Sequence, residues 1–364
     1  MQISRLGAVL GLFSYFGLAT AQTYTSCDPL DKTCPADTAL GKSASYDFTS
    51  GSSSAFEATG TPTYSDDGVA FTVAKEGDAP LIQSKWYIMF GRVEYVIKAA
   101  PGTGIVSSAV LQSDDLDEID LEWLGGNDNE VQSNYFGKGE TTPDNRGATH
   151  SVANCHDEFH TYTVDWTSEQ LVWQIDGKTV RVLTPETANA NQYPQTPMVV
   201  KVGIWAGGDP NNAQGTIDWA GGETNYSAGP YTMYMKSLEV TDYSTGSSYS
   251  YSNKSGLWES ITSDGGKING NIGADTISSQ SAPTITATVS IPIPWPGTHR
   301  ETSSYVTPDV WPWVTGTGAA AYTGTWSYSG SGQIQPPSAA SVIFLPVYIS
   351  LLAVCAGFII PLRL

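Results

Sequence analysis

The chain has 364 residues, enough for one large or two medium-sized domains with a sizeable core. Only 15% of the residues are charged, while glycine, proline, tryptophan and tyrosine number 37, 21, 11 and 19, which argues against a helical bundle or a coiled coil. The formal net charge of −19 would repel a phosphate backbone, so DNA and RNA are poor partners. An uncharged polymer, bound by aromatic faces and hydroxyl-bonding groups, suits this composition better.

The first segment, residues 1–21, is predicted to be a secretory signal peptide. Arg5 precedes an apolar run over residues 6–18, and residues 19–21 (Ala-Thr-Ala) have the small-x-small pattern of a cleavage site. The mature chain then begins near Gln22, and it enters an oxidising compartment.

Three cysteines remain in the predicted mature chain. Cys27 and Cys34 would close a short loop, which we expect to be a disulfide in that compartment. Cys155 is then left over, either as a buried free thiol or as an intermolecular partner. No cysteine spacing resembles a zinc site, and we expect neither a metal nor a cofactor.

The next segment, residues 22–260, is predicted to form one antiparallel β-sandwich. Polar and apolar side chains alternate over residues 91–97. Residues 171–175 and 178–182 flank Asp176-Gly177, a dipeptide typical of a tight hairpin turn with positive φ. Many short strands separated by turn signals, without a sustained helical period, indicate a sandwich. The other predicted strands are residues 69–73, 160–166, 199–205 and 231–240.

The segment 117–123, which reads Asp-Glu-Ile-Asp-Leu-Glu-Trp, carries the predicted chemistry. The period of two in a strand places Glu118, Asp120 and Glu122 on one face and the apolar residues on the other, core-facing side. Three neighbouring carboxylates repel one another, so at least one pKa should rise. An acid/base site uses this arrangement, whereas a structural strand avoids it.

Glycoside hydrolysis requires one carboxylate to attack the anomeric carbon and a second to protonate the leaving oxygen. Retaining enzymes hold the two ~5–5.5 Å apart, whereas Glu118 and Glu122 would lie ~13 Å apart along an ideal strand. Glu118 with Asp120, or Asp120 with Glu122, fits the bare distance better, so the pattern itself leaves the roles open. Calcium ligation, as in legume-type lectins of sandwich fold, and a solvated edge strand are the alternatives.

The segment 261–330 is predicted to be a disordered stalk, because it is rich in serine, threonine, proline and glycine and can bury little core. O-glycosylation would suit this composition. N-glycosylation sequons begin at Asn225 and Asn253, and both fit the secretory route.

The end of the chain, residues 331–364, is predicted to be a removable signal for a glycosylphosphatidylinositol (GPI) anchor. Small residues around Ser329 and Gly330, a polar spacer to residue 341 and an apolar run over 342–362 are the three parts of such a signal. The alternative is a transmembrane tail, which usually carries a polybasic flank that is lacking here.

The acidic segment resembles the active-site strand of glycoside hydrolase family 16, whose fold is a concanavalin-like jelly roll. Its surroundings are similar to the fungal Crh transglycosylases of that family, cell-wall enzymes that join chitin to β-glucan. The resemblance covers about residues 22–260 and extends to the signal peptide, stalk and GPI tail. A cysteine-dense chitin-binding module, which some relatives carry, is lacking. The matching stretches are residues 27–30, 117–123, 132–139, 160–166, 203–209, 215–222 and 229–234.

The resemblance implies roles for particular residues. Glu118 would be the nucleophile and Glu122 the acid/base, with Asp120 between them as an auxiliary that tunes their protonation. The chain would then be a retaining transglycosylase that cleaves chitin and transfers it to β-glucan, with side chitinase activity, at the cell wall and the outer face of the plasma membrane. The alternatives are a β-glucan hydrolase of the same fold and a non-catalytic wall lectin or mannoprotein. The implied sugar contacts are Lys201, Trp205 and Thr216, supported by Gln132, Asn134, Tyr135 and Trp219.

Overall fold

The computed structural model describes residues 25–141, 145–273 and 280 and two short segments, 327–328 and 334–335. The chain divides into two units, residues 1–315 and 316–364. In the second unit, β19 (Ser327–Tyr328) pairs antiparallel with β20 (Ile334–Gln335). The predicted signal peptide and the GPI residues Ser329 and Gly330 lie outside the described residues.

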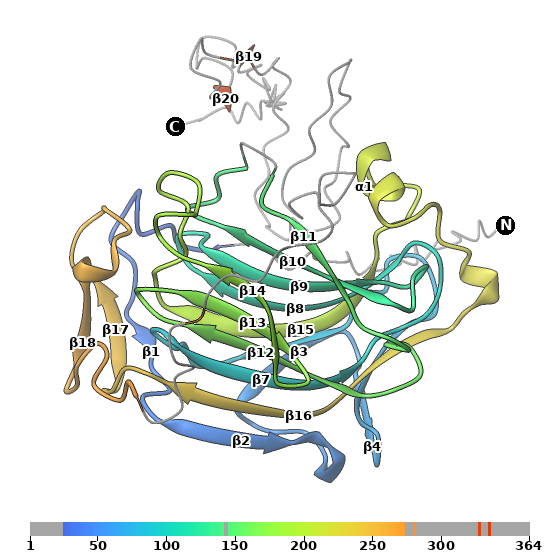
Figure 1. Cartoon of the computed structure of the whole chain (residues 1–364), viewed down its shortest axis with the longest axis horizontal. Helices are drawn as coiled ribbons and strands as arrows, with labels where there is room; N and C mark the ends of the chain where they lie inside the picture. Colours follow the sequence, from blue (N-terminus) through green and yellow to red (C-terminus); the bar gives the residue numbers. More distant parts are fainter. Residues whose placement is uncertain (1–24, 142–144, 274–279, 281–326, 329–333, 336–364) are drawn as a thin grey trace, which may run out of the picture. The chain divides into compact units, whose positions relative to one another are not determined.

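A seven-stranded antiparallel sheet is the first of two large sheets in the first unit (Figure 1). Its order is β11-β10-β9-β8-β15-β6-β3, which puts strands from distant parts of the chain side by side. The strands are β3 (Phe56–Thr59), β6 (Leu81–Ser84), β8 (Ile105–Ser113), β9 (Glu118–Leu124), β10 (Glu130–Phe136), β11 (Ala148–Ser151) and β15 (Met198–Ala206).

The second sheet has eight strands in the order β14-β13-β12-β7-β16-β5-β4, with β2 paired to β16 beside this path. The long strand β16 therefore contacts three partners, β2, β5 and β7. The strands are β2 (Ser43–Asp47), β4 (Thr63–Ser65), β5 (Gly68–Val73), β7 (Gly91–Lys98), β12 (His160–Trp166), β13 (Leu171–Ile175), β14 (Lys178–Leu183) and β16 (Tyr231–Asp242).

A three-stranded sheet of β1 (Asp37–Thr38), β17 (Ser248–Tyr251) and β18 (Ile261–Asp264) completes the folded body. β18 lies in the segment 261–330 that was predicted to be stalk, so the body extends beyond residue 260. Backbone hydrogen bonds tie residues as late as 271 to it, since the amide of Asn271 donates to the carbonyl of Tyr243 over 2.9 Å.

Helices are few and short in the described part of the chain. They are η1 (Phe48–Ser50), α1 (Gln214–Trp219), η2 (Tyr226–Ala228) and η3 (Trp258–Ser260). None of the described helices is long and apolar enough to span a bilayer.

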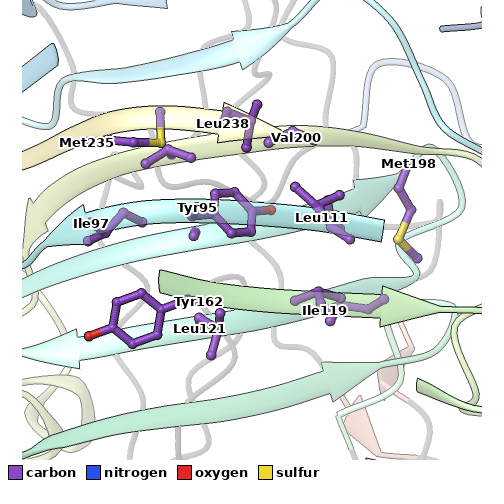
Figure 2. Packing of buried hydrophobic residues seen from close by; sticks show 14 of the residues in the cluster. Tyr95, Ile97, Leu111, Ile119, Leu121, Tyr162, Met198, Val200, Met235 and Leu238 are labelled. Atoms are coloured by element: carbon purple, nitrogen blue, oxygen red, sulfur yellow. The ribbon is translucent and has the colours of Figure 1, made fainter. Parts of the chain in front are cut away.

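The core lies between the two large sheets, where their apolar side chains meet. Figure 2 shows Leu111, Ile119 and Val200 from the seven-stranded sheet packed with Tyr95 and Leu238 from the eight-stranded one. The strict alternation of buried and half-buried residues along β7 explains this packing, because period two sends every second side chain into the core.

The hairpin between β13 and β14 confirms a local prediction. Asp176 and Gly177 have φ values of 48° and 75°, which is the left-handed backbone that a two-residue turn of this type requires. Glycine adopts such a backbone without steric cost, which is why the dipeptide could be identified from the sequence.

Candidate active site

Glu118, Asp120 and Glu122 lie on one face of β9, and the alternate residues of the strand point into the core. Their exposed fractions are 1%, 3% and 4%. Ile119 and Leu121 belong to the hydrophobic core between the sheets, as the period of two predicts. We call the opposite face, with the three carboxylates, the carboxylate face.

The neighbouring strands complete the carboxylate face, because directly paired residues in antiparallel strands point to the same side. The pairs on β10 bring polar side chains next to two of the acids, and those on β8 do the same. On β10 the partners of Glu122, Asp120 and Glu118 are Gln132, Asn134 and Phe136, and on β8 they are Ser108, Val110 and Gln112.

Burial raises the pKa of all three carboxyl groups, and the charges of neighbouring acids raise those of Glu118 and Glu122 further. The pKa of Glu118 rises well above its usual value because of burial first and then the charges of Asp120 and Glu122. The pKa of Glu122 rises similarly through burial and Asp120. Burial raises the pKa of Asp120 to about 7, although Glu118 and the Arg146 guanidinium counteract this. The group therefore retains protons at mildly acidic pH, which is what an acid/base site needs.

Glu118 and Asp120 also influence each other, since Asp120 raises the pKa of Glu118 and Glu118 lowers that of Asp120. Two neighbouring carboxyl groups repel each other when both are ionised, so the pair favours states in which one of them keeps a proton. Asp120 is thus placed to accept or return a proton as the charge on Glu118 changes.

A buried lysine approaches Glu118 from the other side. The Lys201 ammonium, on β15, donates a hydrogen bond to the side-chain oxygen of Gln112. The Gln112 amide in turn donates to Glu118 Oε2 over 3.4 Å. Burial lowers the pKa of Lys201 to about 8, while the charge of Glu118 opposes this shift. The lysine cation favours the ionised form of Glu118, the form that can attack carbon.

Two tryptophans form an aromatic surface beside the Glu122 end of the carboxylate face. Trp205, at the end of β15, is half-buried and stacks on Trp219 of α1, with ring centroids 6.0 Å apart and planes at 27°. The Trp219 indole N–H donates to Gln132 Oε1 over 2.9 Å, and Gln132 pairs with Glu122. Trp219 itself is only 3% exposed, so Trp205 offers the more accessible ring.

The remaining predicted sugar contacts are placed differently. Asn134 pairs with Asp120 and lies on the carboxylate face. Thr216 is buried within α1, one turn before Trp219. Tyr135 points to the opposite side, into the core, where Arg181 covers its ring. The structure therefore does not bring Tyr135 to the carboxylates, and alternation along β10 is the reason.

A glycine-rich set of turns lies between the end of β9 and the C-cap of α1, Ala220, whose carbonyl accepts a hydrogen bond from the amide of Gly104 over 3.1 Å. The amide of Gly102 donates to the carbonyl of Gly125 over 2.7 Å, and that of Gly208 to the carbonyl of Gly104 over 2.8 Å. A Cβ atom on Gly125 would lie 2.3 Å from the Gly102 carbonyl oxygen, and one on Gly208 would lie 2.2 Å from that of Gly222. These backbones approach so closely that only glycine fits.

The start of β9 is fixed by Asp117, directly before Glu118. Its fully buried carboxylate accepts hydrogen bonds from the Lys138 ammonium at 2.6 and 2.7 Å, from the amide of Gln195 at 2.7 Å and from the Thr196 hydroxyl at 2.8 Å. Lys138 follows β10 and Thr196 precedes β15. Asp117 thus joins three strand ends of one sheet, and it is not a solvated edge charge.

Sequence reasoning missed Gln112 and Arg146. Gln112 had a recognisable signal, since Ser108 and Gln112 lie four residues apart in β8 and therefore on the same face of the strand. Arg146 comes from the connection between β10 and β11, and it packs over the ring of Phe136 at 4.6 Å. No local pattern predicts that contact.

The cysteines and the two predicted glycosylation sites lie outside β9 and its neighbouring strands. Cys27 and Cys34 form a disulfide, with Cα atoms 5.8 Å apart. Asn225 and Asn253 are exposed, and each side chain accepts a hydrogen bond from the amide two residues later. Cys155 is free and fully buried.

Comparison with known proteins gives a family for this site. The sequence pattern of "Glycosyl hydrolases family 16" matches residues 49–221. Crh-like protein 4 of Aspergillus fumigatus is 66% identical over 352 residues, which are 94% of this chain and 78% of that protein. Crh-like protein 4 of Botryotinia fuckeliana is 53% identical over 333 residues, 88% of each chain.

The solved structure of Crh5 transglycosylase in complex with NAG is 52% identical, with a TM-score of 0.65, and the match covers 66% of this chain and all of that one. The expected jelly-roll sandwich is confirmed by this likeness and by the two packed antiparallel sheets. With its carboxylate-bearing strand inside the matched region, the chain belongs to the glycosyl hydrolases of family 16, among the Crh-like proteins.

Proposed function

We propose that the chain is a retaining transglycosylase that cleaves chitin and transfers the cleaved piece to β-glucan. The observation that carries the proposal is the trio of buried carboxylates with raised pKa values on one face of β9. The similarity to a Crh5 transglycosylase solved with NAG supports the choice of substrate, since chitin is a polymer of N-acetylglucosamine.

In the first step, a Glu118 carboxylate oxygen attacks the anomeric carbon while Glu122 gives its proton to the departing glycosidic oxygen. The bond from carbon to that oxygen breaks as the ester to Glu118 forms. Asp120 and Lys201 assist, because Asp120 raises the pKa of Glu118 and so tunes its protonation, while Lys201 favours its ionised state. The raised pKa of Glu122 keeps the proton available for this step.

In the second step, an acceptor hydroxyl attacks the same carbon and gives its proton to Glu122, and the ester to Glu118 breaks. Water competes for the intermediate and yields hydrolysis, which accounts for side chitinase activity. A sugar acceptor wins only where the protein binds and orients it. The stacked surface of Trp205 and Trp219, beside Glu122, is suited to hold a sugar ring by its apolar face.

The test uses the purified chain, N-acetylglucosamine oligomers as donor and a labelled β-glucan oligomer as acceptor, with mass spectrometry of the products. We expect hybrid products that carry both sugars. Glu118→Gln, which keeps the size of the side chain, should abolish hybrid and free products together. Cleavage of the glucan alone would support the hydrolase alternative, and no turnover of any donor by the wild-type chain would support the lectin.

We also propose that the mature chain is held at the cell wall and outer membrane face by a GPI lipid attached near Ser329 or Gly330. The small residues, spacer and apolar tail in the sequence support this proposal. A phospholipase specific for inositol lipids should release the membrane-bound protein. Peptides from the segment after residue 342 in the mature protein would contradict it.

A further inference from the structure

A second cluster of chemically active side chains lies in the connections that follow β9 and β11. Asp128, Cys155 and His156 each offer one ligand atom, and these atoms lie within 4.8 Å of one another. The amide of Cys155 donates to the Asp128 carbonyl over 3.0 Å, and that of His156 donates to Asp128 Oδ1 over 2.8 Å. The backbone therefore holds the cluster together before any ligand is considered.

The surroundings of the Cys155 thiol are rich in hydrogen-bond acceptors. Its sulfur lies 3.9 Å from the carbonyl oxygens of Asn127 and Glu130. The His156 side chain is 8% exposed, and its Nδ1 faces Asp128 Oδ1 while the Leu124 carbonyl lies near the ring. Several acceptor atoms thus point to one place where few donors are available, and a bound cation would stabilise such an arrangement.

We propose that Asp128, Cys155 and His156 bind one zinc ion. Thiolate, imidazole and carboxylate are the three ligand types that zinc takes in proteins, whereas calcium and magnesium prefer oxygen alone. His156 Nδ1 and Asp128 Oδ1 are 3.6 Å apart. That separation is close to the edge of ~3.3 Å expected for two ligands at ~2.0–2.1 Å from a tetrahedral zinc.

The fourth position would be taken by water, which can enter beside Asp128, since that side chain is 34% exposed. Metal binding would release the Cys155 proton and hold the sulfur as a ligated thiolate. The ion would join the β9–β10 connection to the segment before β12, and it would shield the free thiol from oxidants. This site uses none of the carboxylates assigned to sugar chemistry.

The test uses the untagged, folded mature chain, stripped with a chelator and then given zinc chloride. We expect one zinc per chain by elemental mass spectrometry, a higher melting temperature, and slower alkylation of Cys155 that the chelator reverses. Cobalt in place of zinc should give the charge-transfer absorption of a thiolate ligand. Cys155→Ala, His156→Gln and Asp128→Asn should each weaken zinc binding at least about tenfold.

Glu158→Gln is the matched control, because it removes an exposed carboxylate two residues after His156 and should bind zinc as the wild type does. Asp128→Asn alters a partly exposed side chain, so its fold is expected to survive even if Cys155→Ala fails to fold. The proposal is overturned if the folded chain takes up no stoichiometric zinc, or if Asp128→Asn and His156→Gln bind zinc with wild-type affinity.

Discussion

Asp120 gives the protein a stability that depends on pH. Its pKa is raised from 3.8 to about 7, mainly by burial. Between these values the folded chain holds a proton that the unfolded chain has lost, so the free energy of unfolding falls as pH rises through this window. Asp120→Asn removes the titrating group. The free energy of unfolding of this variant, relative to that of the wild type, should therefore increase between about pH 4 and about pH 7. Melting temperatures across this range, with exposed Glu259→Gln as control, test it; parallel curves for Asp120→Asn and wild type would contradict the raised pKa.

Glu122 is expected to act as an acid in the first step. Donors whose leaving groups differ in their need for a proton can test this role. Glu122→Gln should slow cleavage of ordinary chitin oligomers by about 10²- to 10⁴-fold. A donor with a good aryl leaving group needs no proton, so a burst of released phenol should survive. Rapid-mixing measurements on both donors check this, and equal losses on both would assign Glu122 another role.

At the scale of single elements, the position of β9 depends on the buried pair of Asp117 and Lys138. Burial would lower the pKa of Lys138, yet the carboxylates of Asp117 and Asp115 outweigh burial and raise it. Lys138→Met leaves Asp117 buried without its cation, and we expect a loss of about 3–5 kcal/mol in the free energy of unfolding. Adding Asp117→Asn should recover part of that loss. Denaturant titration measures this loss. If the ion pair contributed little to stability, Lys138→Met alone would cost less than about 1 kcal/mol.

The short helix α1 is expected to control the fate of the covalent intermediate. Trp219 supports the Trp205 ring and orients Gln132 opposite Glu122. Trp219→Ala should lower transfer more than donor cleavage, so the hydrolysed share rises. Trp219→Phe, which keeps a ring but lacks the indole N–H, should show a smaller change. Free and transferred products from one labelled donor measure the ratio; a proportional fall in both would place Trp219 on the donor side or in the core.

At the scale of the whole molecule, the strand order makes the fold depend on its C-terminal part. Leu81 pairs with Gly203, and Asp47 pairs with Ser237, so distant segments must meet before either sheet is complete. A chain that ends at residue 221 lacks β16, which pairs with three strands. We expect it not to fold, whereas a chain that ends at 273 should unfold cooperatively and turn over substrate. Thermal unfolding followed by circular dichroism, together with activity measurements on both chains, tests this. Cooperative melting of the shorter chain would contradict the dependence on β16.

The sandwich was predictable because period two and turn dipeptides are local signals, and residues 160–166 and 171–175 coincide with β12 and β13. The alternation along β9 likewise predicted the carboxylate face. Arg146 and the distances between the acids depend on how separate connections pack, which no local pattern encodes. Tyr135 was grouped with Asn134 by resemblance, yet adjacent strand residues point to opposite faces. β18 was missed because its pairing with β17 outweighs a polar composition typical of a stalk.

The closely packed glycine turns around Gly102, Gly125 and Gly208 have a consequence for how this enzyme type can diversify. Gly125 and Gly208 meet other backbones and Gly102 meets the Tyr231 ring, so a side chain at any of these glycines would force the turns apart. A saturation library should therefore tolerate almost no substitution there, while neighbouring α1 positions such as Asp218 accept many. New acceptor preferences would then arise through side chains carried by a fixed helix, and rarely through remodelling of the turns that hold it.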